Sequence, residues 1–359
     1  MTTLQNVIDG IQPVSGEWRR RARDYMANLA SPPGALGDLL LLAEQLAGIK
    51  QTLKPSVGSK AVITMAGDHG VVAEGVSAFP QDVTPQMVAN FVAGGAAINV
   101  LAGVAGARVM VVDMGVAADL SELAKQGKII SYKVAAGTQN MAAGPAMSRE
   151  QALQSLEAGI NIAGKLVQEG VELLGTGDMG IGNTTPSSAI LAAFSGLPVE
   201  QVTGRGTGLT DEALENKVRV IQRALAKNLP DPADPVDVLA KVGGFEIGGI
   251  AGIVLGAAYH RVPVVVDGFI SSAGAMLAKK LAPAAAEYMI AAHQSVEYGH
   301  RHMLQELGLK PILNLNLRLG EGTGAVLAMG VVDAAAQVIC KMLTFEGAGV
   351  SRNDSEVCF

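Results

Sequence analysis

Short apolar runs rich in valine and isoleucine alternate, along this chain of 359 residues, with longer segments of helical periodicity. The clearest runs are KAVITMAG at 60–67, ARVMVVDMGV at 107–116 and VPVVVD at 262–267. Apolar runs of this kind are typical of parallel strands buried on both faces, and parallel strands need crossover connections that are usually helical. We therefore predict an α/β fold with a mostly parallel, Rossmann-like sheet and helices on both faces.

The predicted helices rest on periodicity and on capping signals. Apolar residues from Trp18 to Leu29 recur at steps of three and four, and Ser148 to Gln151 forms a capping box that opens a helix to about Gly164. Thr84-Pro85 and Thr185-Pro186 each read as an N-cap followed by a proline at the first helical position. Further elements are predicted as helices at about 36–46, from 84 toward 102, from 185, at 211–226 and from 320 to about 343, and as a strand at 171–175.

No Ser/Pro-rich linker divides the chain, so we expect one compact unit. Residues 1–58 are predicted as the helical segment of a small lobe and residues 59–290 as the α/β domain. Residues 291–359 supply the remaining helices, a glycine-rich loop and a mobile tail from 351. Helices near 297–307 are expected to join the small lobe.

Composition excludes several classes of partner. The net charge of 27 − 33 = −6 provides no global positive field, so nucleic-acid binding is not expected. Two cysteines, Cys340 and Cys358, are too few for a metal tetrad and are typical of a reduced, cytoplasmic protein. The N-terminus lacks the basic and apolar regions of a secretory signal. The apolar stretch 91–107 holds Asn99 and several glycines, so we interpret it as a buried helix running into a strand rather than a membrane span.

Glycine is in excess, with 44 residues, and it concentrates where strands are predicted to end. Ligands of doubly wound sheets bind beyond the carboxyl ends of the strands, and glycine lets backbone amides approach an anion closely. The sequence therefore predicts a locally held phosphate. The loops concerned are Gly67-Asp-His-Gly70, Gly175 to Gly182, Gly204-Arg-Gly-Thr-Gly208 and Arg318 to Gly324.

The run Gly175 to Gly180 formally matches G-x-G-x-x-G, the dinucleotide fingerprint of some oxidoreductases. In that fingerprint the helix begins inside the motif, whereas Thr185-Pro186 places the helix start several residues later. A mononucleotide-like phosphate held by loop amides and a lysine fits better. Lys217 is the candidate lysine, and a solvated helix lysine is the alternative interpretation.

Two carboxylates are candidates for chemistry. Glu321 lies between two glycines and close to Arg318, which favours an acid or base role over a solvated turn. Asp267 closes a predicted strand, where it could accept hydrogen bonds from sugar hydroxyls. The adjacent Asp68 and His69 are expected to point in opposite directions, leaving His69 either to fix its loop or to act.

A metal site is not expected. His300 and His302 lie two residues apart on a predicted helix, do not share a face, and have no cysteine nearby.

Eight motifs occur in the order seen in nicotinate-nucleotide:dimethylbenzimidazole phosphoribosyltransferases, and the chain resembles that family from about residue 32 to about residue 335. The motifs are Ser31-Pro-Pro-Gly-Ala-Leu-Gly37, Gly67-Asp-His-Gly70, Gly137-Thr-Gln-Asn140 with Gly144-Pro-Ala-Met-Ser148, Gly177-Asp-Met-Gly-Ile-Gly-Asn-Thr-Thr-Pro186, Gly204-Arg-Gly-Thr-Gly208, Val242-Gly-Gly-Phe245, Asp267-Gly-Phe269 and Arg318-Leu-Gly-Glu-Gly322.

The resemblance implies a pentosyltransferase of cobamide (cobalamin) biosynthesis. Such an enzyme moves 5-phosphoribose from nicotinate mononucleotide to dimethylbenzimidazole or a related aromatic base, with inversion at the anomeric carbon. The products are the alpha-ribotide and nicotinate. The resemblance implies no metal or redox cofactor, and it implies a homodimer whose active sites draw residues from both subunits.

The resemblance also assigns residues. Glu321 matches the family's catalytic glutamate and would act as the base that deprotonates the incoming ring. Phosphate and ribose would be held by Lys217, Asp178, Gly180, Asn183, Thr184, Gly206, Asp267, Arg318 and Gly320. The base would lie against Phe79, Met87 and Leu319.

The chain departs from the family pattern at a few positions. Asp178 stands where glutamate is usual, Ala35 replaces a frequent serine and Asp38 a frequent arginine. Ala292 stands where some members have a serine that can reach the phosphate. These departures leave open an alternative: a subunit of a heterodimer with a paralogous chain, half-active or inactive alone, that uses a non-standard acceptor such as a phenol.

Overall fold

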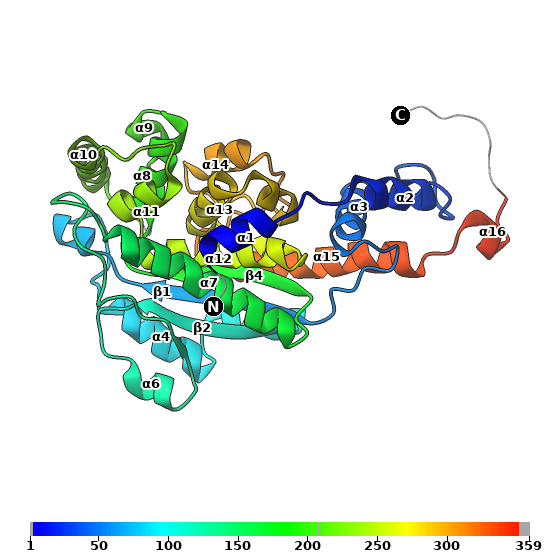
Figure 1. Cartoon of the computed structure of the whole chain (residues 1–359), viewed down its shortest axis with the longest axis horizontal. Helices are drawn as coiled ribbons and strands as arrows, with labels where there is room; N and C mark the ends of the chain where they lie inside the picture. Colours follow the sequence, from blue (N-terminus) through cyan, green and yellow to red (C-terminus); the bar gives the residue numbers. More distant parts are fainter. Residues whose placement is uncertain (1–2, 207, 352–359) are drawn as a thin grey trace.

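A computed structural model describes residues 3–206 and 208–351, and its centre is a six-stranded sheet with every strand parallel to its neighbours. The predicted α/β, Rossmann-like class is confirmed (Figure 1). The order across the sheet reverses direction between β1 and β4, where such folds bind ligands. From edge to edge the strands are β3 (Ile130–Ser131), β2 (Ala107–Gly115), β1 (Lys60–Gly67), β4 (Leu173–Met179), β5 (Val264–Val266) and β6 (Met289–Ala291).

The central strand β1 is buried on both faces, as its unbroken apolar run predicts. Ile63 and Met65 contribute to one hydrophobic cluster, whereas Val62 and Ala66 contribute to a second. This alternation follows from the two-residue period of a strand. The sheet therefore separates two apolar layers.

Helices cover both faces of the sheet, as expected. One face carries α1 (Leu4–Gly10), α7 (Arg149–Gln168), α8 (Thr184–Ser195), α11 (Pro235–Val242), α12 (Phe245–Tyr259) and α13 (Phe269–Leu281). The other carries α4 (Val83–Ala93), α5 (Ala97–Ala105) and α15 (Thr323–Lys341). The remaining elements are α6 (Ser121–Lys125), α9 (Val199–Val202), α10 (Asp211–Asn228), α14 (His300–Leu307), α16 (Phe345–Ala348) and the 3-10 helices η1 (Gly70–Glu74) and η2 (Pro283–Tyr288).

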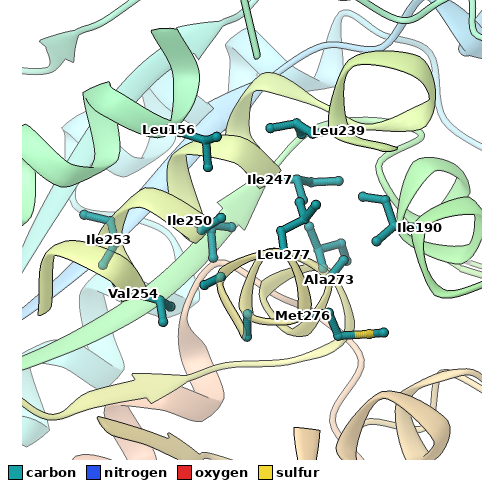
Figure 2. Packing of buried hydrophobic residues seen from close by; sticks show 14 of the residues in the cluster. Leu156, Ile190, Leu239, Ile247, Ile250, Ile253, Val254, Ala273, Met276 and Leu277 are labelled. Atoms are coloured by element: carbon teal, nitrogen blue, oxygen red, sulfur yellow. The ribbon is translucent and has the colours of Figure 1, made fainter. Parts of the chain in front are cut away.

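Helix α12 was not foreseen, because it is buried from Phe245 to Ala258 and so lacks an amphipathic pattern. Figure 2 shows its isoleucines packed between residues of α7 and α13. Glycines bring α12 against α7: a Cβ on Gly252 would lie 2.9 Å from the Cα of Gly159 and would collide with the carbonyl oxygen of Leu156. The two backbones therefore touch.

Two glycine substitutions, one in this contact and one on the open surface of α15, should have opposite effects on stability. We expect Gly252→Ala to lower the free energy of unfolding by about 1–3 kcal/mol, because the added methyl group overpacks the α7–α12 contact. Gly330→Ala, in the exposed middle of α15 with no atom within 4 Å of its Cβ position, should instead stabilise by about 0.5–1 kcal/mol. Urea unfolding measures the free energy of unfolding of both variants. A Gly252→Ala variant as stable as the wild type would contradict the close helix contact.

The small helical lobe is present and is formed by the two ends of the chain. Helices α2 (Gly16–Met26) and α3 (Asp38–Lys50) pack against Ala335 and Ile339 of α15, whose outer part lies beside them in Figure 1. Helix α14, expected to join this lobe, packs on α13 instead. Helix α1 packs on α12 and α7, so residues 1–58 do not all belong to the lobe.

The helix predicted from Thr84 toward residue 102 is in fact two helices. Helix α4 ends at Ala93, the C-cap residue Gly94 has a φ of +79° in the left-handed region, and α5 begins at Ala97. Thr84 does not cap α4 either, because the helix begins at Val83. The buried hydroxyl of Thr84 accepts a hydrogen bond from the Ile181 amide at 3.1 Å. Helix α8 likewise begins one residue before Thr185, with Asn183 at the N-cap.

Two helical stretches, Val83–Ala105 and Thr323–Lys341, are long and apolar enough to cross a membrane by length and composition alone. The first is the interrupted α4–α5 pair, and 28% of its most apolar window is buried. Val100 and Val104 are 62% and 83% exposed, so the prediction of a buried helix between 91 and 107 is wrong for this side of α5. The second stretch is α15, which packs on β4 and β5. Core helices of folded domains pass the same test.

Candidate active site

A cavity of about 240 Å³ opens at the carboxyl ends of the strands, beside the point where the sheet order reverses. The loops after β4, β5 and β6 and the turn before α15 form its walls. The structure brings most of the predicted site residues together here. Those that line the cavity are Phe79, Met87, Asp178, Gly180, Asn183, Thr184, Gly206, Arg318, Leu319, Gly320 and Glu321.

Lys217 lies next to this cavity rather than in it. It lines a smaller hollow of about 40 Å³ that shares Gly180, Asn183, Thr184 and Gly206 with the main cavity. Its side chain is fully buried, and Nζ donates a hydrogen bond of 2.6 Å to Thr184 Oγ1. The alternative of a solvated lysine is therefore wrong. Burial lowers the pKa of Lys217 to about 8, against the opposing charge of Glu297.

Strand β4 is longer than predicted, and the glycines expected to form a loop after residue 175 lie within it. A Cβ on Gly175 would meet Met329 of α15 at 2.6 Å, and one on Gly177 would meet the carbonyl carbon of Glu321 at 2.5 Å. These glycines make room for α15 and for the turn that carries Glu321. The match to the dinucleotide fingerprint therefore has a packing explanation.

Glu321 has a left-handed backbone conformation, with a φ of +64° between two glycines that are also left-handed. Its amide donates to the carbonyl oxygen of Asp178 at 3.1 Å, and Thr64 Oγ1 donates to its carbonyl oxygen at 2.8 Å. A non-glycine residue in this region stores strain, which persists only where neighbours enforce it. Contacts from β4 and β1 thus fix the turn that presents the carboxylate.

The Glu321 side chain is only 4% exposed and lies in the cavity wall. The amide of Ile98, in the first turn of α5, donates to Oε2 at 3.4 Å. Burial raises the pKa of Glu321, and the Ile98 hydrogen bond opposes that rise. A buried carboxylate with a raised pKa is suited to accept a proton near neutral pH.

Asp267 does not line the cavity, and its carboxylate is occupied by backbone groups. Oδ2 accepts from the Gly322 amide at 3.1 Å, and Oδ1 accepts from the Ala325 amide at 2.9 Å. The structure therefore places Asp267 beneath the first turn of α15, and its contact with sugar hydroxyls stays a prediction. Burial raises its pKa to about 7, although backbone hydrogen bonds from Ala325 and Gly322 oppose the shift.

Asp178 is a buried carboxyl group whose two oxygens differ. Oδ2 accepts from Asn183 Nδ2 at 3.0 Å, whereas Oδ1 is buried without a partner in the described structure. Burial, and then the charges of Asp267 and Glu246, raise the pKa of Asp178 well above its ordinary range. A protonated Asp178 can donate a hydrogen bond to a ligand.

His69 fixes its loop. Its Nε2 lies 2.7 Å from Glu246 Oε1 in a fully buried pair, while Asp68 accepts from the Ala117 amide at 2.8 Å, so the two neighbours are not partners. Burial opposes the charged form of His69, but the charge and hydrogen bond of Glu246 outweigh it and raise the His69 pKa. The pair ties the end of β1 to the first turn of α12.

The segment after β6, which no sequence pattern assigned to the site, contributes His293, Ser295 and Glu297 to the cavity. His293 is buried, and its Nδ1 has no partner in the described structure. The Ser295 amide donates to His300 Nδ1 at 2.8 Å, and burial followed by the nearby His293 lowers the His300 pKa to about 3. The signal that precedes this segment in the sequence is the short apolar run MIAA at 289–292. Strand β6 is too short to stand out.

The other departures from the family pattern lie outside this cavity. Ala292 is buried in a hydrophobic cluster, and Ala35 lies exposed in the turn between α2 and α3. Asp38 pairs with Lys310 at 2.6 Å. Of these substitutions, Asp178 alone lines the cavity.

Metal-binding clusters are absent from the described residues, 3–206 and 208–351, where no three His, Cys, Asp or Glu side chains gather in a suitable group. Cys340 is a free thiol, and Cys358 lies outside the described residues.

The sheet order, the glycine-lined cavity at its reversal point and the buried lysine beside it are typical of α/β enzymes that bind phosphorylated ligands. A family profile described as "Phosphoribosyltransferase" matches residues 11–350. The chain belongs to the family of nicotinate-nucleotide–dimethylbenzimidazole phosphoribosyltransferases.

Individual relatives support this assignment over the full length. The nicotinate-nucleotide–dimethylbenzimidazole phosphoribosyltransferase of Geobacter sulfurreducens is 56% identical, over 99% of this chain and 100% of the relative. The protein of the same name from Syntrophotalea carbinolica is also 56% identical, over 98% and 99%. The crystal structure of CobT from Thermus thermophilus is 49% identical and superposes with a TM-score of 0.90, over 94% of this chain and 100% of that one.

Proposed function

We propose that this phosphoribosyltransferase moves 5-phosphoribose from nicotinate mononucleotide to dimethylbenzimidazole, forming the alpha-ribotide of the cobalamin lower ligand and releasing nicotinate. The observation that carries the proposal is Glu321, a buried carboxylate in the wall of a cavity that has apolar residues on one side and the smaller hollow of Lys217 beside it. The names of the relatives supply the two substrates.

The reaction exchanges one bond to nitrogen for another. One ring nitrogen of the benzimidazole attacks the anomeric carbon, and the bond from that carbon to the nicotinate nitrogen breaks with its electron pair remaining on nicotinate. The leaving ring is then neutral at that nitrogen, so it needs no acid. The proton on the other benzimidazole nitrogen goes to Glu321, which acts as the general base.

Phosphate and ribose are held at the glycine-lined end of the cavity. Lys217 and the amides around Gly206 bind the phosphate, and Asp178 and Asn183 lie where the ribose would pass. Arg318 adds positive charge at the cavity wall. Fixing the ribose between phosphate and attacking nitrogen is the positioning part of catalysis.

The acceptor base lies against an apolar wall formed by Phe79, Met87 and Leu319. Apolar packing alone discriminates between rings by only about 1–3 kcal/mol per group, so we expect more than one flat base to be accepted. Assays with a panel of aromatic bases, followed by mass spectrometry of the ribotide, would identify the preferred acceptor.

The decisive experiment incubates the purified chain with nicotinate mononucleotide and dimethylbenzimidazole and follows nicotinate release by chromatography. Release that depends on the base supports the proposal. No release with any of several bases would sink it.

The same enzyme should lose nucleotide affinity when Lys217 is replaced. We expect Lys217→Met to raise the Kd for nicotinate mononucleotide by roughly 10- to 100-fold, because a charge-assisted hydrogen bond contributes about 1.5–3 kcal/mol. Lys227→Met, at an exposed position of the same helix, is the matched control. Equal affinities of the two variants in calorimetry would remove Lys217 from the phosphate site.

The alternative of a half-active subunit with a phenol acceptor is not favoured. Full-length relatives carry the dimethylbenzimidazole name, and Ala35, Asp38 and Ala292 lie away from the cavity. We propose a cytoplasmic homodimer. Light scattering on the active enzyme tests whether it is a dimer. Activity found only after mixing with a second, different chain would restore the alternative.

A further inference from the structure

A turn of the chain at 204–206 is wedged between a buried lysine and a carboxylate. A Cβ on Gly206 would lie 3.7 Å from Lys217 Nζ, whereas a Cβ on Gly204 would collide with Glu297 Oε2. The backbone amide of Gly206 also favours the charged form of the Glu297 carboxylate. Gly204 therefore has no room for a side chain while Glu297 keeps this position, and the turn lies directly against both Lys217 and Glu297.

Glu297 faces this turn from the segment between β6 and α14. It lines the main cavity, and its Oε2 is buried without a hydrogen-bond partner in the described structure. The basic groups whose charge acts on it are Lys217 of α10 and Arg318 of the turn before α15. Arg205, in the turn itself, is occupied by Asp211 and by the carbonyl oxygen of Leu209.

Lys217 needs a nearby negative charge. Its ammonium group is fully buried, and the hydrogen bond that the structure gives it goes to the neutral hydroxyl of Thr184. Burial of an unpaired ammonium favours loss of its proton, and a neutral amine is a poor phosphate ligand. Glu297 is the carboxylate whose charge opposes this loss.

We propose that Glu297 is a positioning residue for the phosphate end of the cavity: it is the counterion of Lys217 and the anchor of the 204–206 turn. In the free enzyme Glu297 keeps the lysine charged and ready for an anion. The charge state of Lys217 in the free enzyme does not depend on the substrate, whereas the consequence for nucleotide binding rests on the proposed function.

The direct test is the titration of Lys217 in protein with ¹³C-labelled lysine, followed by NMR, with Lys217→Met to assign the signal. We expect Glu297→Gln to lower the pKa of Lys217 by about 1 unit or more, because an adjacent opposite charge typically shifts a pKa by about 1–3 units. Glu297→Asp keeps the charge and should restore most of the shift. Glu212→Gln, at an exposed position of α10, the helix that carries Lys217, should leave the Lys217 titration unchanged.

An unchanged Lys217 titration in Glu297→Gln would overturn the inference. Should that variant fail to fold, Glu297→Ser removes the same charge with less bulk in the turn, and its Lys217 titration decides the question in the same way. A loss of thermal stability alone does not mimic the expected result, because a structural role would not move the pKa of one lysine.

Calorimetry with nicotinate mononucleotide provides the second arm. Wild-type affinity should fall as the pH rises through about 8, where Lys217 loses its proton. In Glu297→Gln this fall should begin about 1 pH unit lower. Binding with the same pH dependence in both proteins contradicts the inference. A chain that binds no nucleotide contradicts the proposed function, while the Lys217 titration still decides the role of Glu297.

Discussion

Replacement of Glu321 by glutamine should lower kcat by about 10²- to 10⁴-fold, the usual contribution of a positioned general base. Glutamine preserves the size of the side chain and can still accept from the Ile98 amide, but it cannot take the proton of the incoming base. In the proposed binding mode the nucleotide contacts mainly other residues of the cavity, so its Kd should change little. Steady-state assays of nicotinate release, combined with calorimetry, measure both quantities.

Two further measurements make this prediction specific. Glu212→Gln, which removes an exposed carboxylate from α10, should keep wild-type kcat. Because burial raises the pKa of Glu321 and only its deprotonated form is a base, kcat/KM should fall as the pH drops through a value above the ordinary 4.5. Wild-type turnover in Glu321→Gln would show that another group accepts the proton.

Asp267→Asn should reduce kcat by roughly 10- to 100-fold although the residue does not line the cavity. The carboxylate accepts from the amides of Gly322 and Ala325, and asparagine can present an oxygen to only one of them. The other amide then loses a charge-assisted hydrogen bond, which contributes about 1.5–3 kcal/mol. The turn carrying Glu321 should be less precisely held as a result.

The split between kcat and KM separates two roles for Asp267. If it holds the turn, kcat falls while the KM for nicotinate mononucleotide stays within about threefold of wild type. If it binds ribose hydroxyls, as predicted from the sequence, the KM rises instead. Asp82→Asn is the matched control, because Asp82 is an exposed residue at the N-terminus of α4 whose side chain makes no capping hydrogen bond.

Asp267 should also leave a signature in the pH dependence of stability. Its pKa is about 7 in the folded protein against an ordinary value of 3.8, so the native state keeps a proton that the unfolded chain releases. The free energy of unfolding should therefore fall as the pH rises from about 4 to about 7. Urea unfolding across this range should show a shallower decline for Asp267→Asn than for wild type, and identical slopes would contradict the raised pKa.

Some elements of this protein could be predicted from sequence because local signals specified them. The β-branched run at 60–67 became β1 with those same bounds, and the capping box at Ser148 opens α7. The Gly-Glu-Gly turn marked Glu321 because a carboxylate between glycines is unusual. The glycine excess predicted loops beyond the strands, and several of those glycines line the cavity.

Other elements escaped prediction because their signals were absent or misleading. Helix α12 is buried on all sides, so no periodicity distinguished it, and β6 has only three residues. The glycines of β4 indicated a loop, whereas they serve the close approach of α15 and of the turn that carries Glu321.

Sequence alone determined the fold class, the family resemblance and the identity of Glu321 as the candidate base, because each depends on residue types and spacing along the chain. Only the tertiary structure decided what surrounds that base. The break before Ala97 directs the Ile98 amide toward Glu321, Asp267 holds the turn from beneath, and Glu297 faces Lys217 across a glycine turn. These contacts join segments far apart in sequence, and burial in one folded core gives each charge its neighbours and its pKa.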